Sequence, residues 1–171
     1  MDTIAALRNK RDTRTYTDQP VPHDLVRRLV DVARMAGSAK NVQPVRMVIV
    51  TDDDTKVALQ DSGDFASWIG GAPVVVVVTV VSEAGPRKLF DVGRHAQQLM
   101  VAAFAEGLGS CPVTIHHPDV ARSILGIPEG IDPAMIVTIG WPQHGEKPPP
   151  QIARPRLAID TYASWGSWDN G

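Results

Sequence analysis

The apolar positions of the chain fall into two patterns, which together predict where helices and strands form. Apolar residues at helical spacing indicate amphipathic helices, and short runs rich in β-branched residues indicate strands. Pro22 suits the first turn of a helix, and Gly126 suits a helix end. The expected helices span residues 3–10, 21–37, 55–60, 86–107 and 118–125, and the expected strands span residues 46–51, 72–81 and 134–139.

The run from Ala72 to Val81 gives the strongest strand signal. It is β-branched at nearly every position and does not alternate with polar residues. A strand of this kind is buried on both faces, in the centre of a sheet that helices cover. A few such strands among several helices predict an α+β or α/β layered domain with a central sheet of four or five strands.

Two further stretches bear on the architecture. The longest expected helix, residues 86–107, is slim at Ala102, Ala103 and Ala105, so either another helix packs closely on it or it is an ordinary buried helix. Residues 143–171 begin rich in proline, which predicts an extended C-terminal arm on a single domain spanning 1–171. An extended tail of this kind in a short chain often wraps a partner subunit.

Composition and charge exclude several classes of function. The chain has 171 residues, a formal net charge of -2 and one cysteine, Cys111. A net charge of this size gives no general attraction to nucleic acid or to an anionic membrane. A single cysteine cannot form an intrachain disulfide. No signal-peptide pattern opens the chain, and its longest apolar run is half of what a bilayer requires. We expect a cytoplasmic protein.

Several common catalytic motifs are absent. The sequence has no phosphate-binding P-loop, no dinucleotide-binding glycine fingerprint and no G-x-S-x-G nucleophile turn. The spacing typical of zinc ligands is not found among His95, His116, His117 and Cys111. Asp52-Asp53-Asp54 is interpreted as a helix N-cap, because a metal site needs more oxygen ligands. We therefore expect no metal site.

Four polar segments carry groups that folding alone does not require. The basic segment 10–14 follows the first helix, where its cations either satisfy the helix dipole or bind a phosphate. Residues 37–44 form either a capped turn or a binding turn. Residues 109–115 are expected to leave the long helix as an extended loop whose N–H groups can meet a ligand. The fourth segment is Arg154-Pro155-Arg156.

Taken together, these segments resemble the nitroreductase family in composition and order. The resemblance runs from about residue 4 to residue 160. It rests on KRDTRTY (10–16), DQPVP (18–22), AGSAKNVQPV (36–45), APVVVV (72–77), DVGRHAQQLM (91–100), GLGSC (107–111), LGIPE (125–129) and IVTIGWP (136–142).

The resemblance implies a three-layer sandwich with a mixed central sheet, an intertwined homodimer, and FMN at the interface. On this pattern the basic segment 10–14 and the C-terminal pair Arg154 and Arg156 hold the FMN phosphate and pyrimidine edge. The turn 37–44 of the other subunit faces the flavin ring. The backbone N–H of Thr114 points at the flavin atom that gives up hydride. The implied cofactor-binding residues are Lys10, Arg11, Asp12, Arg14, Ser38, Asn41, Gln43, Pro112, Val113, Thr114, Arg154 and Arg156.

The activity that the resemblance implies is hydride transfer from NADH or NADPH, through FMN, to nitroaromatics, quinones or similar conjugated acceptors. The implied mechanism is ping-pong and needs no side-chain acid or nucleophile. Two alternatives stay open: a specialised dehydrogenase or dehalogenase that uses a deazaflavin donor, and a flavin-binding or sensing protein without turnover. Asp12 stands where the family has serine, so its side chain either turns away, caps a neighbour, or spoils the site. Relatives that fragment flavin also carry an aspartate there, but they lack Asn41. Val45 replaces the usual tryptophan, which leaves more room near the flavin.

Two pairs of residues, one of histidines and one of tryptophans, have two interpretations each. His116 and His117 either face the substrate as a proton source or cap the helix that starts at Pro118, and we favour the cap. Trp165 and Trp168 either form an apolar patch against the partner subunit or stack on the flavin ring, and we favour the patch.

Overall fold

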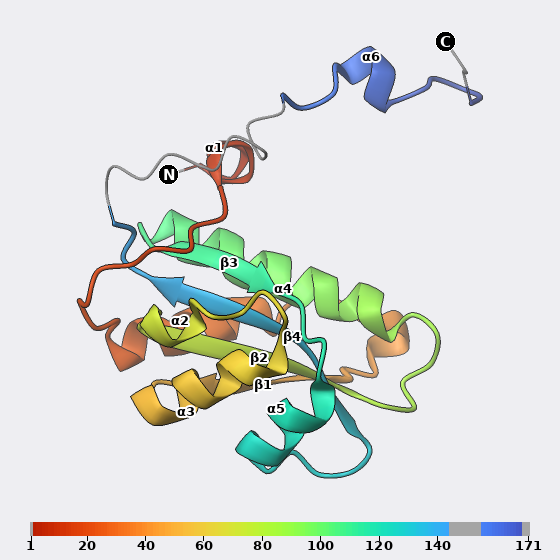
Figure 1. Cartoon of the computed structure of the whole chain (residues 1–171). Helices are drawn as coiled ribbons and strands as arrows, with labels where there is room; N and C mark the ends of the chain where they lie inside the picture. The colour runs from red at the N-terminus through yellow and green to blue at the C-terminus, as the bar shows by residue number, and fades with distance from the viewer. Residues whose placement is uncertain (1, 144–154, 169–171) are drawn as a thin grey trace.

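The computed structural model describes residues 2–143 and 155–168 (Figure 1). Most expected elements form, with ends shifted by a few residues. The α-helices are α1 (Thr3–Asn9), α2 (His23–Ala33), α3 (Asp53–Ala58), α4 (Lys88–Ala105), α5 (Pro118–Leu125) and α6 (Ile159–Tyr162), the 3-10 turns are η1 (Ala39–Asn41), η2 (Leu59–Ser62) and η3 (Ile69–Gly71), and the strands are β1 (Val45–Val50), β2 (Val74–Val81), β3 (Gly109–Val113) and β4 (Ile131–Gly140).

The four described strands form one sheet in the order β1-β2-β4-β3. All three strand pairings are antiparallel, and the parallel contact among the described residues is an isolated bridge between Asp12 and Ser110. The α+β class and the strand number are confirmed, but the sheet of named strands is antiparallel and not mixed. A valine-rich run shows that both faces of a strand are covered, and it does not fix the direction of the neighbouring strands.

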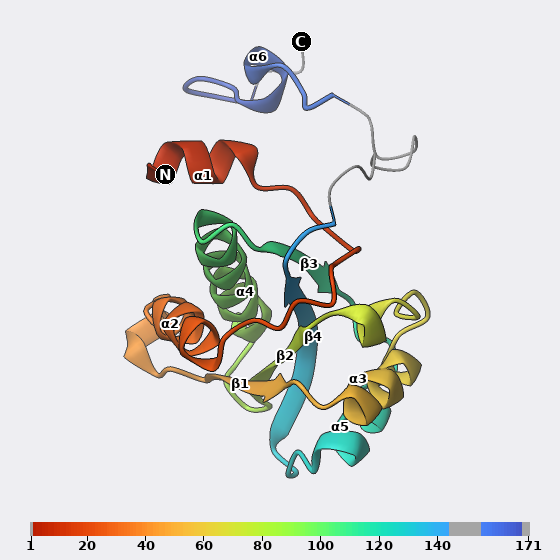
Figure 2. The same ribbon diagram turned by 90° about the vertical axis from the view of Figure 1, so that its left-hand side faces the viewer.

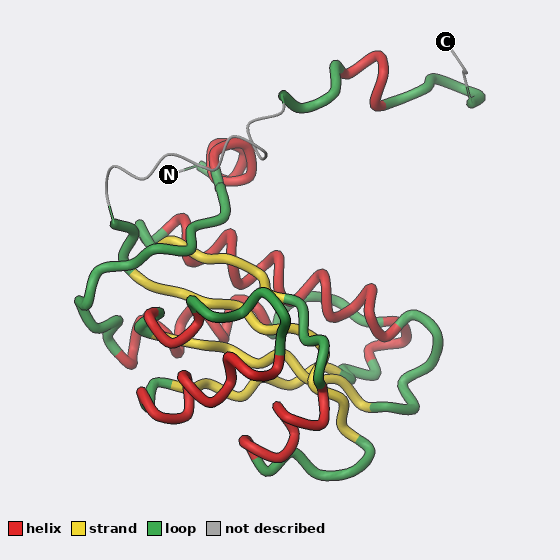
Figure 3. The backbone as a smooth tube through the Cα atoms, in the orientation of Figure 1, coloured by secondary structure: helices red, strands yellow, loops and turns green. Residues whose placement is uncertain are grey.

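Helices cover both faces of this sheet, which gives three layers (Figures 2 and 3). Val74, Val76, Val78 and Val80 of β2 pack into one core cluster with α2 and α4, whereas Val75 and Val77 pack into a second cluster on the opposite face. Each of these valines is at most 1% exposed. Full burial of one such side chain stabilises the fold by roughly 1.5–3 kcal/mol, so the central strand is confirmed as the centre of the core.

Three helix boundaries follow the local sequence as expected. The Asp52 carboxylate accepts a hydrogen bond from Thr55 N at 2.9 Å and caps α3, so the N-cap interpretation is confirmed. Helix α5 begins with Pro118 and ends at Gly126, which has a φ of 61°. A side chain would strain the backbone there, which explains the glycine.

Residues 109–113 correct the sequence-based expectation. They form strand β3, with Ser110 opposite Ile139 and Pro112 opposite Val137 of β4. An extended loop was expected because Gly109 and Pro112 weaken the local strand pattern. Pro112 is tolerated because β3 is the edge strand of the sheet, where a missing N–H costs little. The ladder therefore fixes residues 109–113, and the chain leaves the sheet at Thr114.

The C-terminal segment 155–168 lies apart from the sheet and holds α6 (Figure 1). Its large apolar side chains are exposed, with Trp165 at 82% and Trp168 at 84%. Arg154 lies outside the described residues, so its predicted role has no structural counterpart here. None of the described helices combines the length and the hydropathy that crossing a membrane requires.

Candidate functional site

The basic segment after α1 lies along the outer edge of β3. Thr13 N donates a hydrogen bond to Ser110 O at 2.9 Å, and Tyr16 forms a bridge to Pro142. The Tyr16 hydroxyl lies 2.8 Å from Thr138 Oγ1, and burial raises the pKa of that phenol well above its usual range. A Cβ at Gly109 would lie 2.8 Å from the Thr13 side chain, so the close approach requires glycine. Two of the four predicted segments are thus brought together.

Lys10 and Asp12 compensate each other. The Lys10 side chain is 9% exposed, its ammonium forms an ion pair with Asp12, and it lies 3.5 Å from Met100 Sδ. Asp12, which departs from the family pattern, therefore pairs with a neighbouring cation. This contact reduces the net charge that Lys10 can offer to an anionic ligand.

Arg11 satisfies carbonyl groups at the end of α1. One of its terminal nitrogens donates to Arg8 O and to Lys10 O, each at 2.8 Å. Helix C-termini carry unpaired carbonyls and the negative end of the helix dipole. Arg11 therefore takes the first of the two roles that the sequence allows for the basic segment, in which a cation satisfies the helix end.

Arg14 differs from its two neighbours. Its guanidinium carbon lies 5.7 Å from the centre of the Trp68 ring, and no described carboxylate lies within 4.0 Å of its nitrogens. The Cys111 thiol also faces Arg14; burial raises the pKa of this thiol, although Arg14 acts in the opposite direction. The thiol is therefore neutral and does not cancel the charge of Arg14, which remains available to an anion.

A buried hydroxyl adds to this edge of the sheet. Ser110 is 1% exposed, and its Oγ has no hydrogen-bond partner within the described part of the chain. Burying an unpaired hydroxyl costs about 1–3 kcal/mol by mutational measures. An orphaned polar atom beside the basic segment is consistent with a site that a ligand completes.

The turn between α2 and β1 has unusual backbone geometry. Lys40, Asn41 and Gln43 have φ values of 52°, 56° and 49°. Ser38 Oγ accepts a hydrogen bond from Gln43 N at 2.8 Å, so the Ser38 side chain stabilises the turn. Non-glycine residues in this region are strained, and such strain clusters at functional sites. Among the described residues, no hydrogen bond or ion pair joins this turn to the basic segment of the same chain.

The chain beyond β3 meets a short loop, residues 63–68. Val113 is buried, Pro112 is half-buried and Thr114 is exposed. A Cβ at Gly63 would lie 2.8 Å from Thr114 O, so the two segments touch. The loop also supplies Trp68, which no motif of the sequence indicates.

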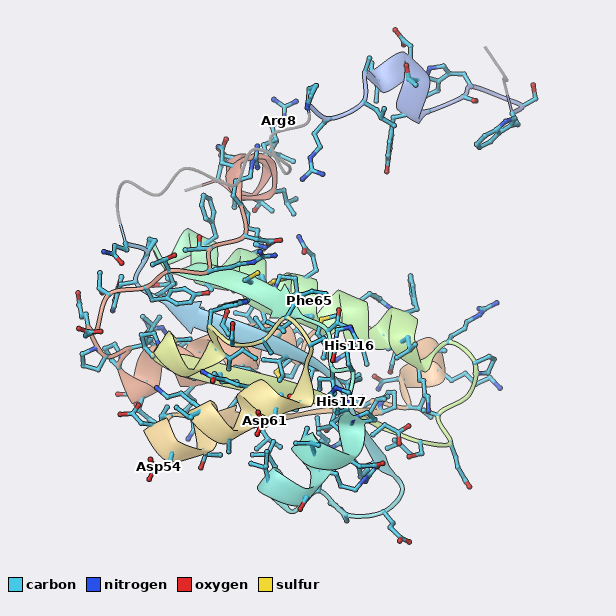
Figure 4. All side chains as sticks on the ribbon, in the orientation of Figure 1. Arg8, Asp54, Asp61, Phe65, His116 and His117 are labelled. Atoms are coloured by element: carbon cyan, nitrogen blue, oxygen red, sulfur yellow. The ribbon has the colours of Figure 1, made fainter. Side chains whose placement is uncertain are left out.

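Two histidines hold the other end of this loop (Figure 4). The N–H groups of His116 and His117 donate to Ser62 O at 2.9 and 3.0 Å, and Asp64 N donates to His116 Nδ1 at 3.2 Å. His117 Nε2 lies 2.8 Å from an Asp64 carboxylate oxygen. His117 occupies the N-cap position of α5, but its side chain makes no capping hydrogen bond, so the favoured side-chain cap is wrong. Spacing along the chain could not reveal Asp64 as its partner.

The remaining predicted residues lie in the C-terminal segment or beyond it. Arg156 is exposed, and Arg154 is outside the described residues. Trp165 and Trp168 line a hollow of about 330 Å³ formed with neighbouring residues of the same segment.

A separate apolar groove runs between α1 and the outer face of α4. Its volume is about 650 Å³, and Leu7, Phe90, Val101, Ala102 and Ala105 contribute apolar surface to it. Leu7 and Phe90 are 54% and 64% exposed. The slim alanine face predicted for α4 therefore borders this groove.

Comparison with known proteins places the sequence in one family. The family model for the nitroreductase family matches residues 7–63 and 64–141. The chain belongs to the nitroreductase family. This confirms the resemblance and supports a role as an oxidoreductase.

Individual relatives cover nearly the whole chain. A Thermus thermophilus protein named NADH dehydrogenase is 26% identical over 93% of this chain and 96% of its own length. A Bacillus subtilis protein named FMN reductase [NAD(P)H] is 23% identical over 98% of this chain and 76% of its own. The structure of an FMN-dependent nitroreductase from Clostridium difficile superposes with a TM-score of 0.86 at 19% identity, covering 96% and 99% of the two chains, which confirms the fold.

Proposed function

We propose that this chain is an FMN-dependent oxidoreductase that takes hydride from NADH or NADPH and reduces conjugated acceptors such as nitroaromatics and quinones. The observation that carries the proposal is that the edge of the sheet at β3 holds both an uncompensated cation, Arg14, and an orphaned buried hydroxyl, that of Ser110. The relatives named as NADH dehydrogenase and FMN reductase support both the flavin and the nicotinamide.

The residues at this edge fit a cofactor with an anionic phosphate and a polar ring. Arg14 is the principal cation, and we assign Lys10, Arg11, Asp12, Arg154 and Arg156 as further candidates around the phosphate and ribityl chain. A guanidinium forms forked, charge-assisted bonds with such groups, each contributing about 1.5–3 kcal/mol. A positive charge near the pyrimidine edge also favours the anionic reduced flavin.

The exposed backbone at Thr114 supplies the second part of the proposal. Pro112 and Val113 are paired with β4, and Thr114, the next residue along the chain, is exposed and carries a backbone N–H beyond the end of this ladder. We assign that N–H to the redox-active edge of the flavin ring. When bound, FMN would supply the two-electron hydride chemistry that links the nicotinamide with the acceptor. The side chains of this chain bind and orient the reactants and exclude water, and none acts as nucleophile.

A second copy of the chain would complete the site. Ser38, Asn41 and Gln43 belong to a strained, exposed turn that makes no described hydrogen bond to the basic segment of its own chain. We propose that this turn faces the flavin of a partner subunit. The apolar groove between α1 and α4 is the proposed contact between subunits, because its exposed apolar surface would then be buried.

The visible spectrum of the purified protein tests the cofactor first. We expect a yellow protein that releases about one FMN per chain on boiling, and that oxidises NADH or NADPH when a quinone or nitroaromatic is added. FMN binding without reduction by NADH, NADPH or reduced deazaflavin would favour a flavin-binding protein without turnover, and reduction by the deazaflavin alone would favour a specialised dehydrogenase. A colourless protein that also fails to take up FMN would overturn the proposal.

A further inference from the structure

The three cations of the basic segment are not equivalent in this fold. Lys10 is paired with Asp12, and Arg11 is bonded to two carbonyl oxygens of its own helix end. Arg14 is exposed, and none of the described carboxylates lies within 4.0 Å of its nitrogens. The guanidinium carbon of Arg14 lies over the face of Trp68, 5.7 Å from the centre of the ring.

An aromatic face holds a cation in a way that a carboxylate does not. The ring attracts the guanidinium through its quadrupole, and it brings no negative charge of its own. A cation held on a ring therefore keeps its full electrostatic attraction for an anionic ligand, whereas an ion-paired cation loses much of that attraction. Arginine suits this arrangement because its planar group stacks on a ring while its edge still donates hydrogen bonds.

Trp68 is itself well fixed. Its Nε1 donates a hydrogen bond to Phe65 O at 3.1 Å, and its ring packs against the second core cluster. Trp68 is also the N-cap of the 3-10 turn η3, and Gly71 N donates to Trp68 O at 3.2 Å. The indole thus belongs to the rigid part of the fold, and the flexible Arg14 side chain rests on it.

The loop that carries Trp68, residues 63–68, contacts the candidate site at both of its ends. Its Gly63 end touches Thr114 O and is held by His116 and His117 through Ser62 and Asp64. Its Trp68 end touches Arg14. One short segment therefore connects the predicted phosphate and pyrimidine side of the site with the predicted hydride-transfer side.

We infer that Trp68 is a positioning residue that holds the Arg14 guanidinium, with its charge uncompensated, at the place where an anionic edge of the flavin binds. This inference rests on the proposed function. It assigns Trp68 no contact with the reacting atoms, and it predicts that Trp68 acts on the flavin through Arg14 alone.

Two matched substitutions isolate the aromatic face. Trp68→Phe keeps a ring beneath Arg14, and Trp68→Leu fills the same core position with an aliphatic side chain. Both lose the hydrogen bond to Phe65 O, so a difference between them reports the ring and not that bond. Thermal unfolding of both apoproteins shows whether each is folded before binding is measured.

The first measurement needs no flavin. In apoprotein with ¹⁵N-labelled arginine, we expect the Arg14 Nε–H resonance, assigned by its loss in Arg14→Gln, to carry a ring-current shift. Trp68→Phe should retain the shift and Trp68→Leu should abolish it, while Trp165→Leu, a control far from Arg14 along the chain, should leave it unchanged. An Arg14 resonance that is the same in all three folded variants would overturn the stack.

The second measurement uses FMN itself. We expect Trp68→Leu to raise the Kd for FMN roughly 3- to 30-fold, and Trp68→Phe to stay within about threefold of the wild type. The reduction potential of bound FMN should become more negative in Trp68→Leu, because the cation that stabilises the anionic reduced form is less well placed.

A double-substitution cycle with Arg14→Gln separates positioning from general structural support. If Trp68 acts through Arg14, Trp68→Leu has little further effect on the Kd or the potential once Arg14 is replaced. Fully additive effects, or a Trp68→Leu variant that binds FMN like the wild type, would contradict the inference. If the wild type binds no FMN, the proposed function fails, and the arginine resonance alone then decides whether Trp68 positions Arg14.

Discussion

At the scale of single residues, charges in this protein are defined by their nearest partners. Lys10, Arg11 and Arg14 lie within five residues, yet one is paired with a carboxylate, one caps a helix and one rests on an aromatic ring. The sequence predicted a cluster of cations and the departure at Asp12. It could not predict the partners, because Trp68 and Met100 are brought to the cluster only by the fold.

The same reasoning predicts that Cys111 is chemically inert in the folded protein. The residue is 1% exposed, and burial raises the pKa of its thiol. The thiolate is the reactive form, so the reactive fraction at pH 8 is smaller than for an ordinary cysteine, and it increases only at higher pH. Iodoacetamide at pH 8, followed by mass spectrometry, should leave the native chain unmodified and label the urea-unfolded chain. Rapid labelling of the native chain would contradict this prediction.

At the scale of elements, turns and strand ends carry the strain and the fixed contacts. The sequence predicts a polar turn over residues 37–44, but it does not predict the positive φ values of Lys40, Asn41 and Gln43 between α2 and β1. Residues 109–113 show the opposite case, since a segment with poor strand propensity is a strand because β4 offers it a partner. Tertiary context overrides local preference in both segments.

Replacing Lys40 with glycine should relieve strain in the turn. Lys40 has a φ of 52°, where a side chain costs roughly 1–2 kcal/mol, so Lys40→Gly should stabilise the protein by about 0.5 kcal/mol after the entropic cost of glycine. Ala39→Gly is the matched control, because Ala39 is not among the positive-φ residues and should lose about 0.5–1 kcal/mol. Urea unfolding of both variants measures the difference. Equal destabilisation by the two substitutions would show that the turn is unstrained.

Asp132 fixes the start of β4 to the start of α4. Its carboxylate accepts hydrogen bonds from Lys88 and Ser82 at 2.7 Å each, and these bonds, the one from Lys88 first, lower its pKa. A carboxyl whose pKa is lowered by folding stabilises the folded state above its unfolded-state pKa, and this stability is lost as the pH falls through the lowered value.

Asp132→Asn should therefore cost about 1 kcal/mol at pH 7, a modest value because the side chain is 35% exposed. The difference from the wild type should shrink as the pH falls below about 4. Unfolding by urea between pH 7 and pH 3 measures it. A cost that does not change with pH would show that the carboxylate charge is not responsible.

At the scale of the whole molecule, the fold leaves apolar surface for a second copy of the chain to cover. Helix α1 buries only Ala6, and the groove between α1 and α4 has a volume of about 650 Å³. The C-terminal segment also exposes several large apolar side chains. These features support the proposed homodimer, in which the turn of one chain faces the flavin of the other.

A charge in the groove should disrupt this assembly. We expect the wild type to sediment at twice its chain mass of 18.5 kDa, and Val101→Glu, which lines the groove, to shift toward the monomer and to lose FMN. Leu89→Glu is the matched control, because Leu89 is 64% exposed on the same helix but does not line the groove. If both variants remain dimeric with circular dichroism like the wild type, the subunits associate through another surface.

The sequence by itself determined the elements, the central buried strand and the family, because hydrophobic period, helix caps and ordered motifs are local properties of the chain. Asp52, Pro118 and Gly126 set helix ends through contacts within a few residues. Only the tertiary structure decided that the sheet is antiparallel, that β3 is a strand, and that Trp68, Asp64 and Ser110 belong to the candidate site. These features depend on partners far away along the chain, whose approach is set by the packing of the whole core.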